Sequence, residues 1–301
     1  MRRAAVALAL LAAACAGPSN TPAPRAAAPA PTGVGTAARP AVPRAFTPAP
    51  DRPVPRDPHK LAEALATTTG DLRAAIETWT STGHPSRGQA PMRVQLLALY
   101  QQRMYRFLAR HPDTAKTAIA AVPGWLRGEA HANLRAGEKL FSLVHPVKHR
   151  PRFKVGLPKP ANVLLGYDRA AQRRFHVSWT VLAAVNYIES KFGRVRSNSY
   201  AGAQGPMQFI PSTWAAYGMG GDVHDPHDAI MGAANYLHHS GAPRNYANAL
   251  YSYNHSYAYV DAVLLYANQM RGDVRDYYEY YDWQVFIVTP YGDKRLTGPG
   301  L

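Results

Sequence analysis

The chain has 301 residues, 47% of them hydrophobic, and carries a formal charge of +15 at pH 7. This length holds one large domain or two small ones with a real core, and the single cysteine, Cys15, excludes an intramolecular disulfide. The charge favours an anionic partner, although scattered Arg and Lys that only keep a protein soluble would give the same value.

Residues 1–15 predict a secretory signal peptide. Arg2 and Arg3 form a positive start, and residues 4–11 form an apolar stretch that is too short to span a membrane. Cys15 stands where a lipoprotein signal places its acylated cysteine, although Ala12 occupies the position where leucine is commonest. We favour lipidation of Cys15, which would require two acyl chains for stable anchoring. Ordinary cleavage before Cys15, leaving a free thiol, is the alternative.

Residues 16–58 predict a disordered linker. Almost half of the 26 prolines fall here, among many alanines, and such a segment buries too little apolar surface to offset its ordering entropy. The predicted signal peptide and the predicted linker together indicate an exported protein of the cell envelope. It would be anchored as a lipoprotein on the outer face of the cytoplasmic membrane, or otherwise secreted. There the expected anionic partner is the cell wall and not nucleic acid.

Residues 59–150 predict a helical accessory region that packs on the second half of the chain. Apolar residues recur at three- and four-residue steps over 61–79 and 96–108. Asp113 is expected to cap a further helix through Ile119, and 129–143 predicts another. We find no catalytic constellation in this region, and the proline-rich, basic stretch 145–160 predicts a connection.

Residues 151–275 predict a second, mainly helical domain. An amphipathic helix is expected over 161–175, and a second over 179–192, with Ser178 as its cap and Gly193 as its stop. Asp225 begins the next helix, through 229–238. Two more are expected over 247–253 and 259–270.

Residues 276–301 predict an aromatic tail that ends in a β-hairpin. The stretch 283–289 is β-branched and aromatic, and residues 290–293 have the composition of a turn.

Glu189 is the candidate catalytic residue. It closes an apolar helix, where the helix dipole and apolar neighbours both disfavour ionisation and raise the pKa of a carboxyl group, as a proton donor near neutral pH requires. The alternative is a surface glutamate paired with Lys191 or Arg194. The residues after this helix favour the catalytic interpretation.

Those residues lie in a glycine-rich turn. Gly202 and Gly205 allow the backbone to approach a ligand, and Ser199 and Gln208 can orient a sugar hydroxyl or an acetamido group without adding charge. Met207 and Phe209 are expected in the core, and Ser212 and Thr213 as helix caps.

No metal or cofactor is expected. His224, His227, His238 and His239 are close in sequence, but no ligand partner occurs at a spacing typical of zinc. Most of the tyrosines that crowd the second half, including Tyr266, are expected to pack in the core, whereas Tyr253 is expected at the site.

Several motifs in fixed order carry a family resemblance. They are ESKFG at 189–193, SYAGAQGPMQFIPSTW at 199–214, DPHDAI at 225–230, AANYL at 233–237, YNHS at 253–256 and YV at 259–260. Residues 156–270 thereby resemble the soluble lytic transglycosylase (SLT) domain, and most closely the branch of membrane-bound lytic transglycosylase B. The resemblance implies a mainly α, lysozyme-like α+β fold for a monomer.

The resemblance also implies a reaction on peptidoglycan glycan strands. Glu189 would protonate the oxygen between N-acetylmuramic acid (MurNAc) and N-acetylglucosamine (GlcNAc), then act as base on the 6-hydroxyl, which closes onto C1 as a 1,6-anhydro end. Ser199 and Gln208 would hold the substrate near that centre, and Tyr253 and Asn254 match the family's tyrosine-asparagine motif on the far wall.

Two other functions stay open from the sequence. A muramidase on the same fold would use water and a second carboxylate, yet Asp222, Asp225, Asp228 and Asp261 show no spacing typical of a nucleophile. A non-catalytic wall-binding or scaffold protein would only hold glycan.

Overall fold

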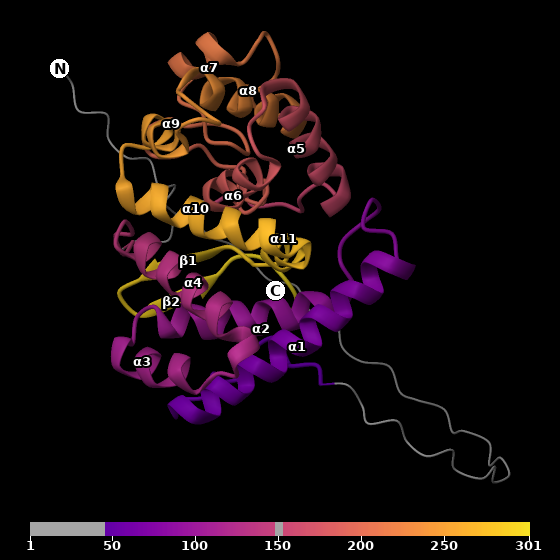
Figure 1. The fold of residues 1–301 in the computed structure, drawn as a ribbon, viewed down its shortest axis with the longest axis vertical. Helices are drawn as coiled ribbons and strands as arrows, with labels where there is room; N and C mark the ends of the chain where they lie inside the picture. Colours follow the sequence, from indigo (N-terminus) through magenta and orange to yellow (C-terminus); the bar gives the residue numbers. More distant parts are fainter. Residues whose placement is uncertain (1–45, 148–152) are drawn as a thin grey trace, which may run out of the picture.

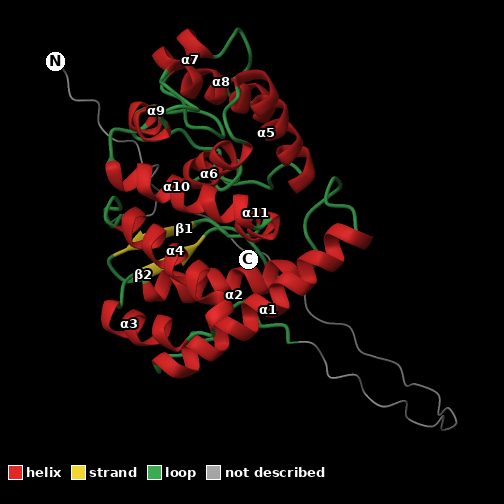
Figure 2. Ribbon diagram, viewed as in Figure 1, coloured by secondary structure: helices red, strands yellow, loops and turns green. Residues whose placement is uncertain are grey.

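The computed structural model describes residues 46–147 and 153–301. The predicted signal peptide, Cys15 and most of the predicted linker lie outside the described residues. The described part holds eleven helices and one two-stranded hairpin, so the predicted mainly α, lysozyme-like fold is confirmed (Figure 2). None of its helices is both long and apolar enough to cross a membrane.

The first four helices form one half of the molecule, drawn indigo to magenta in Figure 1. They are α1 (Pro58–Thr82), α2 (Met92–Leu108), α3 (Pro112–Ala121) and α4 (Gly124–Phe141). Their buried positions follow the helical spacing of the apolar residues. The predicted cap of α3 is wrong by two positions, because His111 is the N-cap and Asp113 lies in the first turn, where a carboxylate still favours the helix dipole.

Residues 46–57, which composition assigns to the linker, run along α2 instead. Phe46 packs edge-on against Tyr100, whose hydroxyl donates a hydrogen bond to the carbonyl of Pro53 (3.2 Å). Arg103 donates to the carbonyls of Pro50 and Arg52. Proline has no backbone N–H to donate, but its carbonyl group still accepts hydrogen bonds, and side chains of α2 supply the donors.

The next five helices form the other half of the molecule (Figure 1). They are α5 (Ala161–Phe175), α6 (Trp179–Ser190), α7 (Pro211–Tyr217), α8 (Pro226–His239) and α9 (Tyr246–Tyr253). Asp225 caps α8 as predicted. Ser178 stands at the N-cap of α6, but its hydroxyl contacts that of Thr180 and no backbone N–H. Ser212 and Thr213 are not caps, because Pro211 opens α7 and places them inside the helix.

Two helices join these halves, and one hydrophobic core runs through both. α10 (Tyr257–Gly272) packs against α4 on one side and α6 on the other, and α11 (Val274–Tyr281), which the sequence did not predict, packs against α1. Edge-to-face rings fill the junction, including those of Tyr187, Tyr266 and Tyr280. The expectation that Tyr266 is a core residue is confirmed.

The predicted hairpin is confirmed, and it lies beside α1 to α4, the helices of the predicted accessory region. β1 (Phe286–Thr289) pairs antiparallel with β2 (Gly292–Arg295), from Phe286 opposite Arg295 to Thr289 opposite Gly292. The chain reaches it through Gln284, which exchanges two hydrogen bonds with the side chain of Gln102. Residues far apart in sequence thus complete one half of the fold.

Candidate active site

The helix α6 positions Glu189 in its last turn. The helix ends at Ser190, two residues before the predicted end, because Lys191, Phe192 and Gly193 all take positive φ angles of 53°, 59° and 80°. The hydroxyl of Ser190 donates to the carbonyl of Pro206 (2.6 Å) and accepts from the N–H of Gly193 (2.8 Å). The end of α6 is therefore tied to the glycine-rich loop.

The carboxyl group of Glu189 has one hydrogen-bond partner among the described side chains. Tyr259, fully buried on α10, donates its hydroxyl to Oε1 of Glu189 at 2.7 Å. Burial raises the pKa of Glu189 to about 8, while the bond from Tyr259 and the charge of Lys191 lower it. The carboxyl group is therefore protonated at neutral pH.

Neither of the two neighbouring cations pairs with Glu189. The ammonium of Lys191 lies 4.0 Å from the centre of the Tyr187 ring and donates to the carbonyl of Tyr187. The guanidinium of Arg194 lies over the ring of Tyr281. In the described structure Glu189 is thus not the surface ion-pair partner that the alternative interpretation required.

The glycine-rich loop holds Ser199 and Gln208 by its own hydrogen bonds. Ser199 Oγ accepts from the N–H of Ala203 (3.0 Å). Gln208, at a φ of 51°, donates from Nε2 to the carbonyl of Gly205 (2.9 Å), which leaves its Oε1 without a partner. A Cβ on Gly205 would lie 1.8 Å from the carbonyl oxygen of Val223, so this position requires glycine. Met207 and Phe209 are buried, as predicted.

Tyr253 ends α9, next to that loop, and Asn254 is the C-cap of the helix. The hydroxyl of Tyr253 donates to the carbonyl of Met207 at 2.6 Å. Burial, and then the charge of Glu189, raise the pKa of Tyr253. Asn254 is 8% exposed and its Oδ1 has no partner.

The structure thus brings together Glu189, Tyr253 and the loop that carries Gln208. Ser199, Gln208 and Asn254 make no hydrogen bond to Glu189 within the described residues. The two buried acceptors without partners, Gln208 Oε1 and Asn254 Oδ1, are free to accept hydrogen bonds from a ligand. Sequence reasoning missed Tyr259, which it treated as one more core tyrosine, although the YV motif at 259–260 contains it.

A cavity of about 150 Å³ lies on the accessory side of Glu189. Tyr187 of α6 and Lys191, just after that helix, line it together with Phe141 of α4 and Phe286 of β1. The accessory helices and the hairpin therefore form part of the wall beside the candidate acid, a role that the sequence did not indicate.

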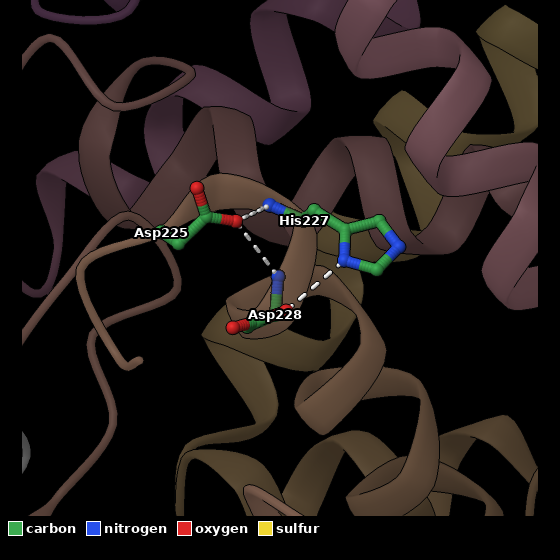
Figure 3. Close-up of side chains that lie close together, drawn as sticks. All are labelled: Asp225, His227 and Asp228. Carbon is green, nitrogen blue, oxygen red and sulfur yellow. Dashed lines mark hydrogen bonds and ion pairs between the residues drawn. The ribbon is translucent and has the colours of Figure 1, made fainter. Parts of the chain in front are cut away.

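A second polar cluster, at the start of α8, is explained by local structure. Figure 3 shows Asp225 accepting hydrogen bonds from the backbone N–H groups of His227 and Asp228, and the side chain of His227 pairing with that of Asp228. The distance between His227 Nδ1 and Asp228 Oδ1 is 3.0 Å. These bonds cap the helix and engage Oδ1 of both Asp225 and Asp228.

Comparison with known proteins finds a family match in the second half of the chain. Residues 166–271 match the family described as Transglycosylase SLT domain. This segment of the chain is therefore similar to the transglycosylase SLT domain. Proteins of this family are lytic transglycosylases, which act on peptidoglycan glycan strands. The matched segment contains Glu189, Tyr253 and the loop between them. Neither the curated proteins nor the solved structures gave a match to the chain.

Proposed function

We propose that this chain is an exported peptidoglycan lytic transglycosylase that cleaves the MurNAc-β-1,4-GlcNAc bond without water and leaves 1,6-anhydroMurNAc ends. The observation that carries the proposal is the half-buried carboxyl group of Glu189, with its raised pKa of about 8, within the segment that matches the SLT domain. A general acid with a pKa near the working pH both holds its proton and releases it readily.

The proposed reaction needs Glu189 in two protonation states. Its proton passes to the departing GlcNAc oxygen as the C1–O bond breaks, and the MurNAc 2-acetamido group stabilises the positive charge at C1. The resulting carboxylate then takes the proton of the 6-hydroxyl, whose oxygen bonds to C1 and restores the acid. Tyr259 donates to the carboxylate, so it stabilises the ionised state between the two steps.

Among the described residues, no second carboxylate shares a hydrogen bond with Glu189 or acts on its pKa, which supports cyclisation over hydrolysis. Asp225 and Asp228 are occupied at the start of α8, and Asp228 also accepts from the N–H of Asp222 (3.0 Å). Asp261 pairs with Lys139 on the surface of α10 (2.7 Å). A hydrolytic muramidase needs a nucleophile or a base that activates water, and none of these carboxylates is available for that role.

Ser199, Gln208, Tyr253 and Asn254 are proposed as the residues that hold the glycan. Gln208 and Asn254 have the strongest support, because each has a buried oxygen without a partner. Tyr253 acts by fixing the backbone at Met207 beside Gln208. We also propose that the enzyme is most similar to the membrane-bound lytic transglycosylase B branch and acts as a monomer without a cofactor.

Export and anchoring rest on the sequence. The predicted signal peptide, Cys15 and the predicted linker support a lipoprotein on the outer face of the cytoplasmic membrane, where the charge of +15 would favour an anionic wall. Mass spectrometry of the native N-terminus tests this placement. A diacylated Cys15 supports it, and an unmodified thiol or an uncleaved leader contradicts it.

Digestion of purified peptidoglycan tests the reaction. The chain and its Glu189→Gln and Glu63→Gln variants are compared, with Glu63 serving as an exposed glutamate on α1. We expect anhydro-ended fragments from the chain and from Glu63→Gln, and none from Glu189→Gln. Reducing ends one water heavier would indicate the muramidase. Glycan binding without products would indicate the scaffold protein.

A further inference from the structure

Three buried carboxylates meet where α4 faces α11, and the proposed reaction uses none of them. Glu129 comes from α4, and Asp276 and Glu279 come from one face of α11, three residues apart. Their exposed fractions are 8%, 3% and 1%. One oxygen from each lies within 4.8 Å of the other two. Two oxygens that bind the same Ca²⁺ at about 2.4 Å lie up to about 5 Å apart, so this spacing suits one shared cation.

The charges in this cluster do not balance. Arg73 of α1 pairs with Glu129 and lies 3.8 Å from Oδ1 of Asp276. The nearby Asp273 and Arg275 neutralise each other at 2.7 Å. Three carboxylates therefore face one guanidinium, and two negative charges are left without compensation in the interior. Such charges must be balanced by protons or by a cation.

Two neutral side chains next to the carboxylates each have a polar atom without a hydrogen-bond partner of normal geometry. The Tyr105 hydroxyl of α2 is 3% exposed and makes no hydrogen bond of normal geometry; the charges of Glu129 and Glu279 and the side chain of Asn133 act on it. Asn133, one turn after Glu129 on α4, is 1% exposed, and its Nδ2 has no partner. Rotation of this amide exchanges its nitrogen and oxygen, and the Tyr280 hydroxyl that donates to Asn133 can accept instead.

We propose that Glu129, Asp276 and Glu279 bind one Ca²⁺, with Tyr105 and Asn133 as neutral oxygen ligands. All five groups offer oxygen, which calcium prefers over the nitrogen and sulfur that zinc prefers. Mg²⁺ retains several of its waters, which a site this buried does not favour. A divalent ion would neutralise the two uncompensated charges and fasten α11, and with it the chain that leads to the hairpin, to the accessory helices.

Calcium binding and thermal stability test the proposal. The full chain is treated with a chelator, dialysed and titrated with CaCl₂ in a calorimeter, and the unfolding temperature is measured with and without Ca²⁺. We expect one Ca²⁺ per chain and a rise in Tm of roughly 5 °C at about 100 times the Kd. Titration with MgCl₂ is expected to give a smaller rise in Tm. Terbium luminescence excited through the neighbouring tyrosines provides a second readout, displaced by Ca²⁺.

Two variants make the test specific. Glu279→Gln keeps the shape of the side chain and is expected to remove both the binding heat and the rise in Tm; Glu129→Gln serves if that variant does not fold. Asp228→Asn, at the cluster in Figure 3, is the matched control and is expected to leave both unchanged. If Ca²⁺ and the chelator leave the Tm of the parent chain unchanged, the carboxylates hold protons and the proposal is wrong. It is also wrong if Asp228→Asn, and not Glu279→Gln, removes binding.

Discussion

The hydroxyl of Tyr259 donates a hydrogen bond to Oε1 of Glu189 across 2.7 Å, from the first turn of α10 to the last turn of α6. Ser256 caps α10 and so fixes where that first turn begins. The only hydrogen bond to the carboxyl group of the candidate acid in the described structure therefore depends on how another helix starts, 70 residues later in the chain.

Replacing Tyr259 by Phe should shift the pH profile of the enzyme. The hydrogen bond lowers the pKa of Glu189, so its loss raises that pKa and moves the alkaline limb of kcat/KM to higher pH. The maximal rate should fall roughly 10-fold, because the carboxylate between the two steps loses its donor. Tyr266→Phe, which also removes a buried hydroxyl but not from Glu189, is the control. An unshifted limb in Tyr259→Phe would contradict this role.

The parent chain should lose activity as the pH rises through about 8. The general acid must be protonated, and burial raises the pKa of Glu189 to about 8. Initial rates of release of anhydro-ended fragments, measured at subsaturating substrate from pH 5 to 10, report this limb. If the rate instead falls with a midpoint near 4.5, the ordinary pKa of glutamate, Glu189 is not the acid.

The Glu189→Gln variant should be more stable than the parent chain at neutral pH. The folded-state pKa of about 8 lies above the ordinary 4.5, so this group favours the folded state most below pH 4.5, and that contribution is lost as the pH rises towards 8. Gln does not ionise, so the variant should gain about 2 kcal/mol at neutral to alkaline pH. Thermal unfolding of both proteins should show a difference in Tm that disappears near pH 4.

Replacing Tyr253 by Phe should lower turnover more than it lowers stability. The lost hydroxyl frees the carbonyl of Met207 beside Gln208, at a cost of about 1 kcal/mol in unfolding free energy. The neighbouring Tyr236 makes the same kind of bond, to the carbonyl of Ser252 (2.7 Å), so Tyr236→Phe is a matched control. Urea unfolding and digestion rates are compared. Equal losses of rate in the two variants would assign Tyr253 a packing role.

Replacing Gly205 by alanine should cost more unfolding free energy than replacing Gly202 by alanine. Both have positive φ angles, 71° and 80°, but only at Gly205 would the added Cβ collide, 1.8 Å from the carbonyl of Val223. Gly202→Ala should cost about 1 kcal/mol, whereas Gly205→Ala should cost more than about 3 kcal/mol or prevent folding. Urea unfolding measures both. Similar costs would show that the close approach at Gly205 is relieved by a small shift of the loop.

The sequence predicted the helices well where apolar spacing was regular, as in α1, α2 and α10. It also predicted Asp225 as a cap, because a carboxylate before a proline has one simple local explanation. It missed α11, whose run of tyrosines has its own helical face, because aromatic residues favour strands equally well. It placed the end of α6 two residues late, since Lys191 and Phe192 adopt a conformation that non-glycine residues rarely show.

For the site, the sequence indicated Glu189 and its chemistry, but not its surroundings. The bond from Tyr259 and the cavity wall formed by Phe141 and Phe286 depend on contacts between distant segments. No local pattern encodes such contacts. The same holds for residues 46–57, whose composition resembles a linker but whose carbonyls find donors on α2.

The paired hydrogen bonds between Gln102 and Gln284 join residues 182 positions apart. Trp283 adds a third, from its ring N–H to Gln101. During synthesis on the ribosome, α1 to α4 therefore emerge long before the segment that completes their packing. Until residues 283–297 arrive, the side chains of α2 that will contact them face solvent. The half formed by α1 to α4 is therefore open to chaperones and proteases during synthesis. Truncation within residues 283–297 removes packing contacts from the first half of the fold as well as from the last.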